Sequence, residues 1–111
     1  MDTTLSDVTS IELNRRVAMA LGWTEEHFRY YWLTVQWDRD WESMRSLLGD
    51  IDKLGWGWRF EREPGRDPIV QIRAYEVGGY PRLFDTSAPT LPRAVAEAFV
   101  LATEPVPKEE K

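Results

Sequence analysis

The sequence predicts an α/β (α+β) fold, a three-layer α/β/α sandwich with a four-stranded, mostly antiparallel sheet between its helices. Three observations support this. Helix and strand periodicities follow one another in the order α-β-α-β-β-β-α along 111 residues. Short turns join the last three predicted strands, which favours an antiparallel meander. The first predicted strand is apolar on both faces, which favours helices on both sides of the sheet.

The first two elements are predicted at residues 10–21 and 28–37. Thr9 and Glu12 fit a capping box, and Gly22 stands where a glycine commonly ends a helix, so the first segment is predicted to be helical. The second segment is rich in aromatic and β-branched residues and contains no glycine or proline, which predicts a strand. Because its two faces are both apolar, we expect this strand to be covered on both sides.

The second helix carries the clearest amphipathic pattern of the chain. Asp40 can cap it, and Gly55 closes it. Its apolar residues fall three or four positions apart, which predicts one buried face. They are Trp41, Met44, Leu47, Leu48, Ile51 and Leu54.

Three short strands follow, predicted around residues 56–61, 70–75 and 80–84. Apolar and polar residues alternate in the first two of them, and glycine-containing turns separate all three. Pro81 cannot donate a hydrogen bond to a ladder, so the last of these strands is expected at an edge of the sheet.

The last helix is predicted over residues 91–102, capped by Ser87 or Thr90. Its apolar residues line one side. The chain is then predicted to form one domain over residues 10–102. The polar segment 1–9 and the acidic, proline-containing segment 103–111 are expected to be disordered.

The composition excludes several classes of site. The chain has no cysteine, which excludes disulfides and thiol nucleophiles, and its one histidine, His27, makes a catalytic zinc site hard to build. A net charge of −5 opposes phosphate-tracking nucleic-acid binding. No signal peptide and no apolar run of the roughly 18 residues that span a membrane are recognisable. We therefore expect a cytoplasmic protein with no metal and no cofactor.

Carboxylates are the remaining candidates for chemistry. Asp38, Asp40 and Glu42 have the spacing that opens a calcium loop, but Ser43 and Gly49 occupy positions where that loop needs glycine and glutamate. They are interpreted as an acidic helix start. The carboxylates of the meander alternate with arginines, which is typical of cross-strand charge pairs. The chain is therefore predicted not to be an enzyme; an enzyme would need a cleft that holds a perturbed carboxylate.

Three segments carry a resemblance to a known family. They are IELNRRVAMALGW at 11–23, LGW at 54–56 and APTLPRAVAEAF at 88–99. Together they resemble the phage ABA sandwich domain family, small proteins encoded by phages and prophages, over about residues 10–102. The resemblance implies α/β/α layering and a phage or prophage origin. It implies no activity, because the family has no established functional residues. The sequence departs from the family pattern at 31–37, which is unusually aromatic.

The aromatic residues are the main functional signal. Six tryptophans lie between residues 23 and 58. Trp41, Trp56 and Trp58 share the phase of other apolar residues and are expected in the core. The others, with the tyrosines, are hard to bury together in a chain of this size, and exposed Trp and Tyr anchor protein interfaces. The candidate protein-binding residues are Tyr30, Tyr31, Trp32, Trp37, Asp38, Glu42 and Asp52.

These observations predict a non-enzymatic, phage- or prophage-encoded module that binds another protein. One version is an inhibitor of a host defence nuclease, similar to an anti-CRISPR protein, whose acidic side chains would face a basic channel. The alternative is a self-associating structural or assembly accessory protein, whose aromatic residues would pack a symmetric dimer. The expected partner is thus a host protein or a second copy, with no direct contact to nucleic acid or membrane.

Overall fold

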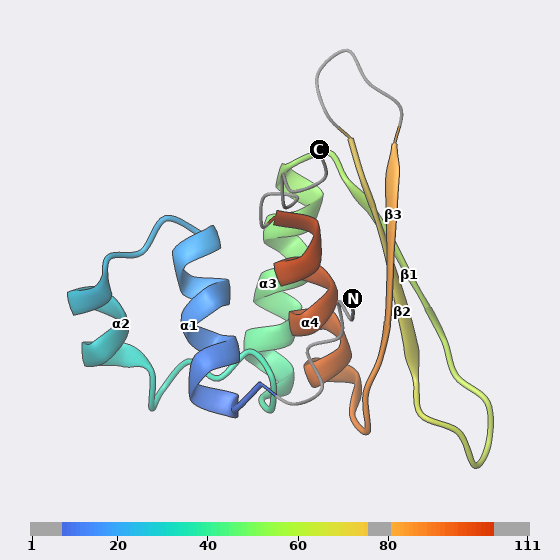
Figure 1. The fold of residues 1–111 in the computed structure, drawn as a ribbon, viewed down its shortest axis with the longest axis horizontal. Coiled ribbons are helices and arrows are strands. Elements are labelled where there is room, and N and C mark those ends of the chain that lie inside the picture. Colours follow the sequence, from blue (N-terminus) through green and yellow to red (C-terminus); the bar gives the residue numbers. More distant parts are fainter. Residues whose placement is uncertain (1–7, 76–80, 104–111) are drawn as a thin grey trace, which may run out of the picture.

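A three-stranded antiparallel sheet forms one side of the molecule, and its helices stack on the other (Figure 1). The structure is a computed structural model that describes residues 8–75 and 81–103. Its elements are α1 (Ser10–Ala20), α2 (Glu25–Tyr31), α3 (Trp41–Lys53), β1 (Gly57–Glu61), β2 (Ile69–Ala74), β3 (Arg82–Ser87) and α4 (Leu91–Thr103). The fold is α+β, with the strands in the order β1-β2-β3.

The helices are arranged in successive layers beside the sheet. α4 packs on β2 and β3, and α3 packs on α4 and β1. α1 covers the far side of α4, and α2 lies beyond α1 (Figure 1). The predicted sandwich with helices on both faces of the sheet is therefore wrong, because every described helix lies on the same side.

The register of the strands explains why one face stays open. Ile72 lies between Trp58 and Phe84 in a row that faces the helices, and Ile72 is fully buried. The opposite face is polar along its middle row, where the Gln71 amide donates a 2.9 Å hydrogen bond to Asp85. An antiparallel sheet with such alternation tolerates water on one face.

The predicted strand over residues 28–37 is also wrong. Its first residues belong to α2, and the rest form a loop that leads to α3. Thr24 caps the helix by accepting a 3.0 Å hydrogen bond from the backbone N–H of His27, and two glutamates occupy its first turn. Only Phe28 and Trp37 of the segment are buried at 4% and 3% exposure. Since β propensity depends on burial among neighbours, aromatic content alone does not make this segment a strand.

The helix ends follow the sequence signals closely. Thr9 accepts a hydrogen bond from the Glu12 backbone N–H, which is the N-cap half of the predicted capping box, while the Glu12 carboxylate accepts from Arg15 and Arg16. Gly22, at φ 93°, closes α1, and the backbone N–H of Trp23 then donates to the carbonyl of Ala18 at 2.9 Å. This is a Schellman arrangement, which favours glycine for its left-handed backbone. Gly55 closes α3 in the same way, at φ 78°.

The last strand is shifted from its predicted position, and the predicted cap of the last helix is confirmed. β3 begins after Pro81 and continues to Ser87, where Thr86 donates a 2.7 Å hydrogen bond to the carbonyl of Ala94. It lies at an edge of the described sheet, as predicted. Thr90 caps α4. Of the segments predicted to be disordered, Thr9 and Thr103 belong to helix ends and Val8 packs against the core. The remaining residues, 1–7 and 104–111, lie outside the described residues.

The core is centred on α4, which is covered by the sheet on one side and by α1 and α3 on the other. Its largest fully buried side chains are Phe99, Leu13, Leu47, Ile51, Ile72, Val17, Val70, Val95 and Val100. Of the three tryptophans expected here, Trp56 is half-buried and packs against the core, whereas the other two are exposed. Trp41 is 54% and Trp58 36% exposed, whereas Trp37, expected to be hard to bury, is at 3%. The helical spacing correctly identified the buried face of α3. Trp41 lies in the first turn of that helix, where its side chain is exposed.

Asp40 offers a direct test of the helix signals. Its carboxylate accepts hydrogen bonds from the backbone N–H of Ser43 at 3.0 Å and from the Ser43 hydroxyl at 2.8 Å. We expect Asp40→Ala to lower the free energy of unfolding by about 1 kcal/mol, because α3 loses its cap. Asp40→Asn retains a capping oxygen and should cost much less in urea denaturation. Equal losses in the two variants would contradict the capping role.

Candidate functional site

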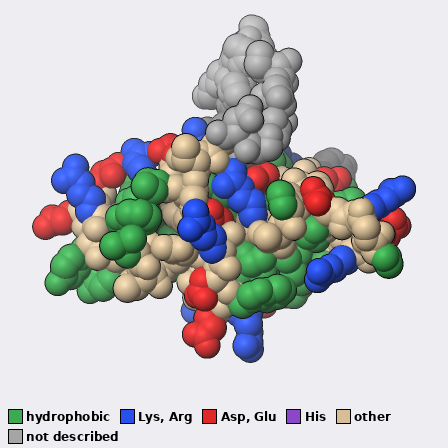
Figure 2. Space-filling view, turned by 90° about the horizontal axis from the view of Figure 1, so that it is seen from below, with side chains coloured by type: hydrophobic (Ala, Val, Ile, Leu, Met, Phe, Trp, Pro, Cys, Tyr) green, Lys and Arg blue, Asp and Glu red, His purple; other side chains and the backbone are tan. Residues whose placement is uncertain are grey.

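The two most exposed large hydrophobic side chains of the described residues, Tyr30 and Leu33, lie on α2 and just after it, next to the exposed Tyr31. Tyr30 is 80% exposed, Leu33 69% and Tyr31 42%. We call these three residues the α2 surface. Among the described elements, α2 contacts α1 alone. Figure 2 shows hydrophobic side chains at the left end of the molecule, the end where α2 lies in Figure 1. An apolar surface that projects in this way is typical of a protein-binding site.

The sequence of α2 dictates which side faces outward. Phe28 is the one buried residue of the helix and holds it against the rest of the molecule. The helical period of 3.6 residues turns Tyr30, two positions later, to the side opposite that contact. Tyr31, three positions later, lies on the flank next to Phe28, where its ring packs against Trp23 and His27. Tyr30 therefore remains in solvent although the helix itself is docked, and Tyr31 is about half as exposed.

An ion pair fixes α2 to α1 at its N-terminal end. Arg15 Nε donates a 2.9 Å hydrogen bond to a carboxylate oxygen of Glu25, and Arg15 Nη2 lies 2.6 Å from the same oxygen. This hydrogen bond, with the negative charges of Glu25 and Glu12, raises the pKa of Arg15 above its ordinary value. Because the pair is solvent-exposed, it orients the helix more than it stabilises the fold.

A chain of aromatic rings runs from the core to the α2 surface. The ring centroid of Trp23 lies 5.1 Å from that of Trp37 and 4.3 Å from that of His27. His27 lies 4.8 Å from Tyr31, which lies 4.9 Å from Tyr30. Most of these pairs meet edge to face, a favoured geometry. The exposed tyrosines are thus supported by a packed column, which lowers the entropy cost of using them in an interface.

A hollow of about 640 Å³ opens beside the tyrosines. It is lined by Thr24, Glu26, His27, Arg29, Tyr30 and Tyr31. Aromatic rings therefore lie next to one acidic, one basic and one imidazole side chain. Protein interfaces likewise combine aromatic side chains with polar and charged ones.

The structure separates the residues that were predicted as one binding site. Tyr30 and Tyr31 lie together on the α2 surface, and Trp32 is half-buried beside them, packed against the core. Glu42 and Asp52 are exposed on α3, which does not contact α2. The Asp52 carboxylate accepts a 2.9 Å hydrogen bond from the Trp58 indole.

Trp37 and Asp38 do not belong to an accessible site, because both are buried. Sequence reasoning missed Leu33 and the contribution of His27. The helix-start signature Thr24-Glu25-Glu26 could have indicated that this segment is helical and so placed His27 next to Tyr31.

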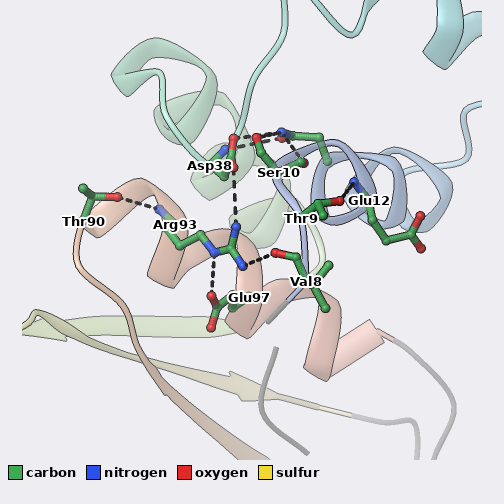
Figure 3. A network of polar contacts seen from close by, with 9 residues as sticks. Val8, Thr9, Ser10, Glu12, Asp38, Thr90, Arg93 and Glu97 are labelled. Carbon is green, nitrogen blue, oxygen red and sulfur yellow. Dashed lines mark hydrogen bonds and ion pairs between the residues drawn. The ribbon is translucent and has the colours of Figure 1, made fainter. Parts of the chain in front are cut away.

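Asp38 belongs instead to a buried polar network between α1, α4 and the loop before α3 (Figure 3). The Asn14 amide donates to Asp38 at 2.8 Å, and Arg93 Nη1 lies 3.8 Å from the other carboxylate oxygen. Arg93 also donates to Glu97 at 2.7 Å and to the carbonyl of Val8 at 2.7 Å. Two buried carboxylates thus share one guanidinium, and their hydrogen bonds hold three segments of the chain together.

Within 8–75 and 81–103, no three His, Cys, Asp or Glu side chains are grouped so that they could hold a metal ion. In those same ranges, none of the helices has the length and apolar character needed to cross a membrane. No protein-family model matches the sequence, and a search of curated proteins finds no significant match.

Proposed function

We propose that this protein is a non-enzymatic binding module and that the α2 surface is where it contacts another protein. The observation that carries the proposal is the 80% exposure of Tyr30 on a helix that contacts α1 alone among the described elements. Tyrosine supplies a large contact area with few rotatable bonds, which makes it a frequent anchor in protein interfaces. The column of rings behind it supports this use.

The partner we propose is a host protein of a bacterium, with a phage or prophage as the source of this chain. A defence nuclease is the specific version of this proposal. The net charge of −5 supports it, since an acidic protein associates faster with the basic channel of a nuclease. In this version Tyr30 and Tyr31 anchor the complex, while the exposed Glu42 and Asp52 on α3 contribute to the long-range field rather than to the contact itself.

Replacing Tyr30 or Tyr31 with alanine is expected to weaken partner binding by roughly tenfold or more, the effect of losing an interface anchor. The free energy of unfolding should change by less than about 0.5 kcal/mol for the more exposed Tyr30.

The partner is identified by capture from nuclease-treated bacterial lysate. A photo-crosslinking amino acid is placed at position 30, and the crosslinked proteins are identified by mass spectrometry. Trp41, which is 54% exposed on α3, is the matched control position.

One host protein that is crosslinked from position 30 and not from position 41 would support the proposal. The same proteins crosslinked from both positions would contradict it, because the α2 surface would then have no selectivity. Crosslinking of the chain to itself from position 30 would instead favour the second candidate, a self-associating accessory protein.

A further inference from the structure

β1 has a strand neighbour on one side only among the described residues. It pairs with β2 through all five of its residues, while the other side of its backbone faces outward from the sheet. α3 covers the helix-facing side of β1 but does not extend the ladder. An unpaired edge of this kind can accept another strand, and natural proteins usually protect such edges.

The charges on β1 are arranged so that this strand complements itself. Arg59 and Glu61 are two positions apart on the open face, and their side chains are 64% and 63% exposed. They approach each other at 3.8 Å within one chain, a weak contact in water. Because both point to the open face and not into the core, neither prevents a second strand from approaching the edge.

Pairing β1 with β1 of a second copy restricts the choice of register. A two-fold axis perpendicular to the sheet keeps the helices of both copies on the same side of the joined sheet. Directly opposite residues then have side chains on the same face, so the axis must run between the two copies of one residue. An axis at Arg59 or at Glu61 places like charges directly opposite each other, which is destabilising. An axis at Phe60 places each Arg59 opposite Glu61 of the second copy.

Within β1, which ends at Glu61, the Phe60 register pairs residues 59–61 of the two copies. If the pairing extends beyond Glu61, it brings Trp58 opposite Arg62 of the second copy, an aromatic–cation pair. Gly57 then lies opposite Glu63, where there is no side chain to oppose the carboxylate. The other edge strand, β3, is directly preceded by Pro81, which lacks a backbone donor, so pairing along that edge cannot extend past the start of the strand.

We infer that this protein forms a symmetric dimer by antiparallel pairing of two β1 strands, centred on Phe60, with Arg59 of each copy bound to Glu61 of the other. The resulting six-stranded sheet leaves the α2 surface of each copy accessible, since α2 and β1 do not contact each other. The dimer is therefore independent of the function proposed for α2.

The test is sedimentation of the full chain over a concentration series, with charge variants of β1. The wild-type protein should show a monomer–dimer equilibrium. Arg59→Glu and Glu61→Arg should each weaken the dimer by roughly tenfold, because each creates two like-charge pairs across the axis. The double variant with both changes should recover most of the wild-type affinity, since the pairs are then restored with opposite sign.

Arg73→Glu is the matched control, a reversal of an exposed arginine on the central strand of the same face. It should leave the dimer unchanged. Thermal unfolding of the dilute monomers checks that all variants are folded, which their exposure leads us to expect. A monomer at every concentration would overturn the inference. So would a double variant as weak as the single ones, which would place the axis elsewhere, or an equal effect of Arg73→Glu.

Discussion

Replacing Arg93 with alanine is expected to lower the free energy of unfolding by about 3 kcal/mol. Arg93 contacts both Asp38 and Glu97, whose side chains are only 3% and 4% exposed. Its removal leaves two buried carboxylates without the guanidinium that pairs with both of them. We take the lower end of the range for a broken buried ion pair, because the Arg93 side chain retains 17% exposure.

Urea denaturation of three variants separates this electrostatic cost from lost packing. Arg73→Ala, on the open face of the sheet, should cost less than about 0.5 kcal/mol. Adding Asp38→Asn and Glu97→Gln to Arg93→Ala should recover part of the loss, since the repelling charges are removed. A cost below about 1 kcal/mol for Arg93→Ala would show that the network adds little, contrary to the structure.

Phe99→Ala is expected to cost about 3–5 kcal/mol, as large as any single substitution in this protein. Phe99 is 1% exposed on α4, the helix that contacts the sheet, α1 and α3. Because the sheet, α1 and α3 all pack around α4, the residues next to Phe99 are held in place and cannot fill the cavity that alanine would leave. The loss includes the transfer free energy of the ring and the cost of the cavity.

The control for Phe99 is Leu83→Ala, which removes an apolar side chain that is 56% exposed on the open sheet face. It should change the free energy of unfolding by less than about 0.5 kcal/mol. Phe99→Leu should fall between the two, since most of the volume remains. Similar losses for Phe99→Ala and Leu83→Ala would contradict the placement of the core on α4.

Local signals predicted most of the secondary structure, because caps and periodicity act over a few residues. Thr9, Asp40 and Thr90 each cap the helix expected from them, and Gly22 and Gly55 end two helices. The three strands of the meander were found for the same reason. Only β3 was misplaced, where Thr86 is held by its hydrogen bond to Ala94 on α4, a contact that no local pattern shows.

The failures concern burial, which depends on the whole fold. The segment 28–37 looked like a doubly covered strand, yet it buries only Phe28 and Trp37 and leaves Tyr30 in solvent. The expected sandwich took its fourth strand and its second helical layer from this misassigned segment. Likewise, periodicity predicted a buried face for α3 but not how far along the helix that face is covered, so Trp41 was misplaced.

The candidate binding site was predictable in part. Tyr30 and Tyr31 were selected because a chain of this size cannot bury all its aromatic residues. Asp38 was selected for its charge, but it pairs with Arg93, 55 positions later in the sequence, and such a pairing is visible only after folding. Leu33 has no distinguishing feature in the sequence; its exposure follows from the loop after α2.

The most direct test of the proposed function is the affinity of the purified partner, once captured, for three forms of this protein. Titration calorimetry on the wild type, Tyr30→Ala and Trp41→Ala compares two exposed aromatic residues on different helices. We predict a roughly tenfold or larger rise in Kd for Tyr30→Ala and an unchanged Kd for Trp41→Ala. An unchanged Kd for Tyr30→Ala, with the protein folded, would contradict the assignment of the α2 surface as the binding site.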